Sequence, residues 1–159
     1  MTPVPNSTPP ADGIQIILGS NGITYVGGIY KCRIQGNCPS GVGSPISFSG
    51  IMAGFELYYP PKSSPNYSAM SCAPDLFICY SGQCVTTPLP QINQPISGTL
   101  TVSVSRNETK AVLQLNNGSI YTITAPISVD TKAAEVSVTT GSNYATWDIS
   151  EIKVVTSLV

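Results

Sequence analysis

The stretch Ser97–Thr124, SGTLTVSVSRNETKAVLQLNNGSIYTIT, decides the fold. From Leu100 to Val104 apolar residues alternate with hydroxyl residues, which is the two-residue period of a strand with one buried face. A turn around Asn107 follows, and a second alternating run comes after it. Asn116-Asn117-Gly118 predicts a type I′ hairpin turn, because Asn and Gly tolerate the positive φ that this turn needs. The stretch therefore predicts three antiparallel strands joined by two tight turns.

The remaining chain continues the same pattern of short apolar or alternating runs separated by turn residues. No stretch has the 3.6-residue period of an amphipathic helix, so we expect almost no helix. The further strands that we predict are Ile14–Leu18, Ile23–Val26, Ile46–Tyr59, Ala134–Val138 and Trp147–Val159. This pattern predicts an all-β fold, a two-sheet antiparallel β-sandwich of the jelly-roll or concanavalin-like kind.

The chain divides into an arm and one domain. Residues 1–12 hold four prolines, which lack the amide donor and favour an extended arm. Residues 13–159 are long enough for a single β-sandwich domain. Within it, residues 62–95 are rich in cysteine and proline, and we expect an irregular excursion there. Long loops of this kind usually carry function or make contacts.

Charged residues are scarce, at 9% of the chain, with seven basic and eight acidic side chains. The lack of a basic patch argues against nucleic-acid binding. No apolar run is long enough for a membrane-spanning helix. A surface with few carboxylates loses little stability through protonation as the pH falls, which suits an acidic environment. A merely neutral, Ser/Thr-rich surface domain is the alternative interpretation.

Five cysteines and the absence of histidine restrict the chemistry further. Without His the chain lacks the commonest metal ligand and general base, so we expect no metal site and no cofactor. The cysteines lack paired C-x-x-C spacing, which argues against a zinc ribbon. Five cysteines suggest two disulfides and one remaining thiol. Disulfides imply an oxidising compartment, or a hyperthermophile, in which intracellular disulfides are common. The disulfide candidates are Cys32, Cys38, Cys72, Cys79 and Cys84.

The sequence contains four N-x-S/T sequons for N-glycosylation. They lie at Asn6, Asn66, Asn107 and Asn117. Single matches are common by chance, but the last two fall on predicted hairpin tips, where a glycan would reach solvent. The sequons favour an extracellular protein with an exposed, glycosylated surface.

Three short segments of the sequence resemble motifs of the glutamic peptidases, or eqolisins. They are Ile34-Gln35-Gly36, Phe55-Glu56-Leu57-Tyr58-Tyr59-Pro60 and Ala134-Glu135-Val136. The family consists of acid endopeptidases on a concanavalin-like double sheet, in which a Gln and a Glu activate the attacking water. The resemblance implies that Gln35 and Glu135 would be the catalytic pair, with Glu56 nearby. The alternative interpretation of both glutamates is a solvated or hydrogen-bonded carboxylate on an outward sheet face.

Three hypotheses of function follow. The leading one is a structural subunit of an extracellular filament, surface coat or virion, of the kind found in a thermoacidophilic archaeon or its virus. It would assemble as a homo-oligomer or with capsid or filament neighbours, through strand donation or sandwich packing. Its expected contact elements are Thr2–Leu18, Ile149–Val159 and the cysteine-rich excursion.

The second hypothesis is the acid endopeptidase. The third is a carbohydrate-binding sandwich, in which a group of aromatic side chains would form the sugar platform. That group comprises Tyr58, Tyr59, Tyr67, Phe77 and Tyr80. The more common role of such a group is core or subunit interface.

Overall fold

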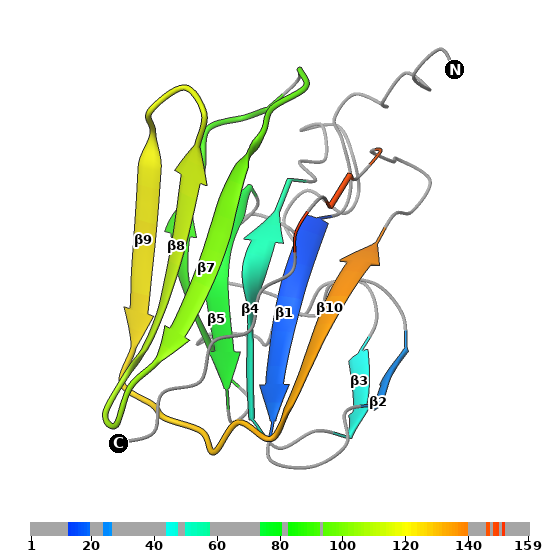
Figure 1. Ribbon diagram of the computed structural model, residues 1–159, viewed down its shortest axis with the longest axis vertical. Coiled ribbons are helices and arrows are strands. Elements are labelled where there is room, and N and C mark those ends of the chain that lie inside the picture. Colours follow the sequence, from blue (N-terminus) through cyan, green and yellow to red (C-terminus); the bar gives the residue numbers. More distant parts are fainter. Residues whose placement is uncertain are drawn as a thin grey trace.

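The computed structural model describes residues 13–19, 24–26, 44–47, 50–57, 74–80, 83–92, 94–139, 146, 148–149 and 151. Ten strands form within these residues, and they contain no helix. The strands are β1 Gly13–Gly19, β2 Thr24–Val26, β3 Ser44–Ser47, β4 Gly50–Glu56, β5 Asp75–Tyr80, β6 Gln83–Pro88, β7 Gly98–Val104, β8 Thr109–Leu115, β9 Ile120–Ala125 and β10 Ala133–Thr139. Apart from a small β2–β3 pair, they form two antiparallel sheets packed as a sandwich (Figure 1). The predicted fold class is therefore confirmed.

The larger sheet has five strands in the order β10-β1-β4-β5-β6. Each neighbouring pair is antiparallel. β1 lies in the interior of this sheet, where all seven of its residues pair with β10 on one side and with β4 on the other. Residues 13–18 of the expected contact element Thr2–Leu18 are thus held between two strands of their own sheet, and the contact role of this element stays a prediction.

The smaller sheet is the predicted meander, β7-β8-β9. Its residues alternate between the two faces as expected: Ala111, Leu113 and Leu115 of β8 are buried, whereas Lys110 and Gln114 on the other face are exposed. β7 and β9 show the same alternation less sharply, because both are edge strands among the strands described. The sequence pattern thus gave the correct strands and the correct faces.

The turn between β8 and β9 differs from the predicted type I′ geometry. The Gly118 N–H donates to the Leu115 carbonyl at 3.0 Å, so Asn116 and Asn117 are the two central residues of the β-turn. Gly118 follows them with φ of 91°, and the Leu115 N–H donates to the Ser119 carbonyl at 2.9 Å. This is the pattern of a three-residue hairpin loop closed by a left-handed glycine. Only glycine adopts that position without a steric cost.

The hydrophobic core lies between the two sheets. Contacts between the sheets run from β8 and β9 to β5 and β6. The buried apolar residues of this core are Ile51, Ala53, Phe55, Leu57, Leu76, Ile78, Leu89, Ile92, Ala111, Leu113, Leu115, Ile123 and Ala125. The large sheet contributes alternate residues of its central strands, as one face of a pleated sheet must.

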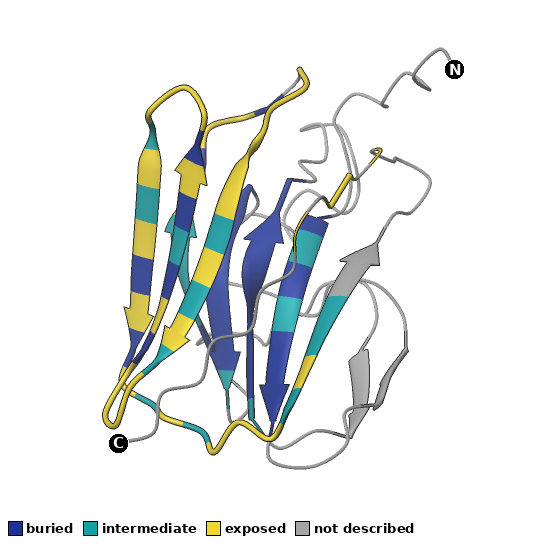
Figure 2. Ribbon diagram, viewed as in Figure 1, coloured by how far each residue is buried: buried dark blue, intermediate teal, exposed yellow. Residues whose placement is uncertain are grey.

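The opposite face of the large sheet is buried as well. Ile17, Met52 and Phe77 are fully buried, yet they do not belong to the core between the sheets. β4 and β5 are accordingly buried along their whole length except for one half-buried end residue each, as the predominant dark blue of both strands in Figure 2 shows. A strand buried on both faces has a continuous apolar sequence rather than an alternating one.

Two predictions about this part of the chain were wrong. The expected irregular excursion, residues 62–95, contains β5 and β6, which pair with each other in the large sheet. The expected single strand Ile46–Tyr59 is divided into β3 and β4, which belong to different sheets. A strand division near Gly50 fits the tight packing there, because a Cβ on Gly50 would lie 1.9 Å from the Leu18 carbonyl oxygen.

The remaining predictions of strands and arms lie largely outside the described residues. Residues 1–12, and residues 152–159 of the predicted strand Trp147–Val159, belong to this group. The predicted strand Ala134–Val138 is confirmed as part of β10.

Candidate functional site

Three polar side chains are buried side by side on the face of the large sheet that points away from the small sheet. They are Gln15 on β1, Glu56 on β4 and Asp75 on β5, and we call them the buried polar cluster. Glu56 is the direct cross-strand partner of Asp75. Since directly paired residues project their side chains to the same side, these two carboxyls are neighbours. Gln15 is opposite Gly54, which places it one diagonal step from Glu56.

Two glycines make room for this arrangement. Gly13 is opposite Glu56 and Gly54 is opposite Gln15, so the corner formed by these four residues carries only the two polar side chains. At Gly54 the strands approach each other closely: a Cβ there would lie 2.1 Å from the Ile14 carbonyl oxygen. Glycine is therefore required at this position of β4, and the polar side chains lie over bare backbone.

The three side chains of the buried polar cluster differ in the interactions that they make. Gln15 and Asp75 have no exposed surface, and Glu56 is 2% exposed. Glu56 and Asp75 each interact with a partner. The Gln15 amide makes no hydrogen bond through Nε2 or Oε1 with any residue that the structure describes. A buried amide in this state costs about 1–3 kcal/mol.

Such burial limits the chemistry available to the cluster. A general acid or base must come within hydrogen-bond distance of a substrate. Side chains with 0–2% exposure do not reach a substrate in solution. The cluster is therefore better suited to fixing the strand register in the sheet interior than to catalysis, since buried polar groups favour one pairing over its alternatives.

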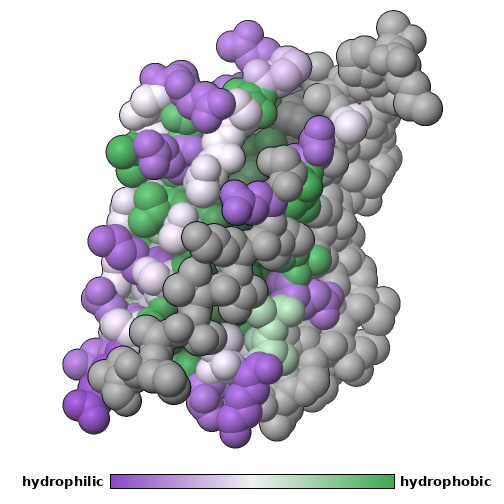
Figure 3. Space-filling model, viewed as in Figure 1, coloured by the Kyte–Doolittle hydropathy of each residue, from purple (hydrophilic) through white to green (hydrophobic). Residues whose placement is uncertain are grey.

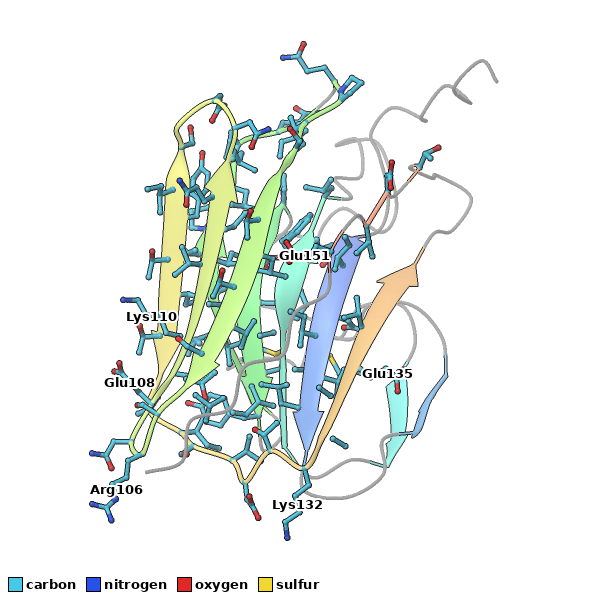
Figure 4. The ribbon with its side chains drawn as sticks, in the orientation of Figure 1. Arg106, Glu108, Lys110, Lys132, Glu135 and Glu151 are labelled. Carbon is cyan, nitrogen blue, oxygen red and sulfur yellow. A yellow bond between two sulfur atoms is a disulfide. The ribbon has the colours of Figure 1, made fainter. Side chains whose placement is uncertain are left out.

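The predicted catalytic pair is not brought together within the described residues. Gln35 lies outside them. Glu135 is half-buried on β10 and pairs with Ile17. Figure 4 shows it on the outer strand, away from the other labelled charged side chains.

The prediction that Glu56 would lie near Glu135 is wrong. Glu135 pairs with Ile17, whereas Glu56 pairs with Gly13, four residues further along β1. The two glutamates are also separated by two strand spacings, because β1 lies between β10 and β4. With ordinary sheet dimensions they are about 16 Å apart.

The cysteine and aromatic predictions are partly resolved. Cys79 and Cys84 form a disulfide between directly paired residues of β5 and β6, with Cα atoms 4.0 Å apart. The other candidates, Cys32, Cys38 and Cys72, are outside the described residues. This disulfide is buried, so it serves as a structural link rather than an exposed redox centre.

The predicted aromatic platform is not formed by the two members that the structure describes. Phe77 is fully buried and Tyr80 is half-buried. They are three residues apart on one strand and point to opposite faces. A buried ring offers no surface on which a sugar could stack. Tyr58, Tyr59 and Tyr67 lie outside the described part of the chain.

The two sequons on the meander are at opposite ends of β8. Asn107 is in the turn before β8 and Asn117 in the turn after it, and both are exposed. Both asparagines thus lie exposed in the turns, as predicted from their sequence context. Asn6 and Asn66 are outside the described residues.

The described residues hold no cluster of three or more His, Cys, Asp or Glu side chains arranged to bind a metal ion. They also contain no helix long and apolar enough to cross a membrane. No family model matches the chain, and neither a curated protein nor a solved structure matches it.

Proposed function

We propose that the protein is a structural subunit of an extracellular filament, surface coat or virion, in which neighbouring sandwiches are joined by strand addition. The observation that carries this proposal is the unequal size of the two sheets. The large sheet has five strands and the small sheet has three. Because the small sheet contacts β5 and β6, the apolar face of β1 and β10 extends beyond it (Figure 1).

Burial along the large sheet reflects this mismatch. In one row of paired residues, Ala53 and Ile78 in the middle are fully buried, whereas Ile16 and Val136 toward the β10 edge are only half-buried. Apolar side chains that keep partial exposure in a row gain further burial when another element covers them. This strip is the surface that a neighbouring chain would cover.

The adjacent edge of the small sheet is formed by β7, which has no second strand partner among the described residues. Among the described strands, β7 pairs only with β8, and its seven residues are in unbroken register. Its sequence, GTLTVSV, contains no charge and no proline. Edge strands that must not pair usually carry such residues or a bulge. The inward side chains Leu100, Val102 and Val104 are half-buried and pack against the core between the sheets.

A donated strand would satisfy both features at once. Its backbone would pair with β7, and its alternate side chains would cover the half-buried strip. The segment Ile152–Val159 of a neighbouring copy has a suitable alternating pattern, because Ile152, Val154 and Leu158 would share one face, with Thr156 among them. This segment lies outside the described residues, and its assignment rests on the sequence pattern.

Surface chemistry is consistent with an exposed assembly. The outward residues of the small sheet are mostly Ser and Thr, and among the nine of them in its three strands only Lys110 is charged. Figure 3 shows this face as pale and purple residues interspersed with green ones. With sequons at both ends of β8, glycans would flank this face, which leaves the β7 edge and the strip for contacts.

The experiment compares two lysine substitutions on β7. In Val102→Lys the charge replaces a half-buried inward side chain of the edge strand and would oppose the addition of a strand there. In Thr101→Lys it points to solvent from the same strand, as a matched control. We expect the parent and Thr101→Lys to associate with increasing concentration in sedimentation velocity, and Val102→Lys to remain monomeric with an unchanged far-UV circular dichroism spectrum.

A synthetic peptide of residues 151–159 provides the second arm. Added to a chain that ends at residue 151, it should bind and protect the β7 amides from hydrogen exchange. A parent protein that stays monomeric at all concentrations would contradict the proposal, as would equal association of both lysine variants.

A further inference from the structure

The two sequons of the small sheet differ in the position of their third residue. That residue must be Ser or Thr, which means that its hydroxyl belongs to what the glycosylating enzyme recognises. In the Asn107 sequon the hydroxyl is on Thr109, and in the Asn117 sequon it is on Ser119. Exposure of the asparagine alone therefore does not decide whether a folded chain can be modified.

The fold buries the hydroxyl of the Asn107 sequon, so the glycosylating enzyme cannot reach it. Thr109 is the first residue of β8 and has no exposed surface. It points inward with Ala111 and pairs with Val104 on β7 and with Ala125 on β9. Its hydroxyl donates a hydrogen bond of 2.8 Å to the Ile127 carbonyl. The enzyme cannot reach this hydroxyl unless the end of β8 separates from both neighbouring strands.

The second sequon remains open. Asn117, Gly118 and Ser119 all belong to the loop between β8 and β9, and Ser119 is half-buried rather than buried. The Asn117 Oδ1 accepts a hydrogen bond of 2.9 Å from the Ser119 N–H. This bond occupies the amide oxygen and leaves the amide nitrogen Nδ2, the atom that receives the sugar. A Cβ added at Gly118 would have no atom within 4 Å, so the loop is open to solvent on that side.

We propose that Asn117 is the glycan acceptor of the folded subunit, and that Asn107 accepts a glycan only before folding buries Thr109. The co-substrate is a lipid-linked oligosaccharide. Its anomeric carbon forms a bond to Nδ2 while its bond to the lipid phosphate oxygen breaks, the lipid phosphate leaves, and the amide proton passes to a base. This inference rests on the proposed extracellular function for the encounter between the chain and the enzyme.

The test uses purified folded protein, a single-subunit oligosaccharyltransferase that accepts N-x-S/T, and its lipid-linked oligosaccharide. Asn117→Gln leaves only the Asn107 sequon on the meander, and Asn107→Gln leaves only that of Asn117. Synthetic peptides of residues 103–111 and 113–121 report how well the enzyme accepts each sequon without a fold. Site occupancy is measured by mass spectrometry of proteolytic fragments.

After normalisation to the peptides, we expect folded Asn117→Gln to be modified at Asn107 at least about tenfold more slowly than folded Asn107→Gln is modified at Asn117, because modification of Asn107 must await local opening. Co-translational modification in microsomes should occupy both sites. Equal rates on the folded variants would overturn the inference, and so would a folded chain that is modified at neither site. None of these readouts depends on assembly, so a failure here is distinct from a failure of strand addition.

Discussion

The two sheets bury their residues in different ways. In β8, a strand of the small sheet, buried and exposed residues alternate strictly from Thr109 to Gln114, apart from the half-buried Val112. In β4 and β5 of the large sheet, burial is continuous from Ile51 to Glu56 and from Asp75 to Cys79 (Figure 2). The small sheet thus resembles an ordinary half-solvated antiparallel sheet, whereas the centre of the large sheet is packed on both faces.

This difference decides where the chain tolerates change. An outward residue of the small sheet contacts water and can vary at little cost. At the centre of the large sheet neither face has room for a different volume, because interiors are close-packed. We therefore expect matched substitutions to have large effects in the large sheet and small effects in the small one.

The largest contrast should come from truncating one apolar residue in each sheet. Ile78 on β5 is fully buried, whereas Val102 on β7 is half-buried. We expect Ile78→Ala to lower the free energy of unfolding by about 4 kcal/mol, from lost burial plus the cavity left behind. Val102→Ala should lower it by about 1 kcal/mol, since less apolar area is removed from the core. Urea denaturation of both variants measures the difference.

Equal losses for Ile78→Ala and Val102→Ala would mean that the β7 edge is buried as deeply as the sheet centre. That result would argue against an open strip beside β7.

Two glycines give the second contrast. A Cβ on Gly54 would lie 2.6 Å from the Gln15 Cα, within the backbone of β1. We expect Gly54→Ala to cost about 3 kcal/mol or more, because neighbouring backbone cannot move aside cheaply. Gly118→Ala meets no atom within 4 Å but has φ of 91°, so only the left-handed strain of about 1 kcal/mol applies.

Thermal denaturation followed by circular dichroism checks the two glycine variants. If Gly118→Ala proved the more damaging of the two, the close approach of β1 and β4 would not be a constraint on the fold.

The smallest effect should have the opposite sign. Gln15 is fully buried with an amide that finds no partner among the described residues. Replacing it by Met keeps the volume and removes the unsatisfied polar group, so Gln15→Met should stabilise the protein by about 1 kcal/mol. Gln114→Met, on the exposed face of β8, should change stability by less than about 0.5 kcal/mol. A destabilised Gln15→Met would show that the amide does make a hydrogen bond.

The sequence predicted the small sheet correctly for a physical reason. A strand with one face in water must alternate, and that alternation is visible from Leu100 to Leu115 without knowledge of the partner strands. The same reasoning failed for β5. Its sequence, DLFICY, is continuously apolar after the first residue and is flanked by proline and cysteine, so it was interpreted as part of an irregular excursion.

The buried polar cluster was only partly predictable. Glu56 was correctly expected on the strand face opposite Phe55, because side chains alternate along β4. Gln15 was a readable signal, since it is the one polar residue among the apolar residues of Ile14–Leu18. Its neighbours were not predictable, because the pairing of β1 with β4 and of β4 with β5 is a property of sheet order. Local sequence does not specify that order.

The position of β1 also determines when the large sheet can be completed. β1 pairs with β10 in a register that joins residue 13 to residue 139. During synthesis on the ribosome, one edge of β1 therefore stays unpaired until β10, near the end of the described chain, has emerged. Contacts so distant in sequence slow folding, and an unpaired edge is prone to aggregation during the delay.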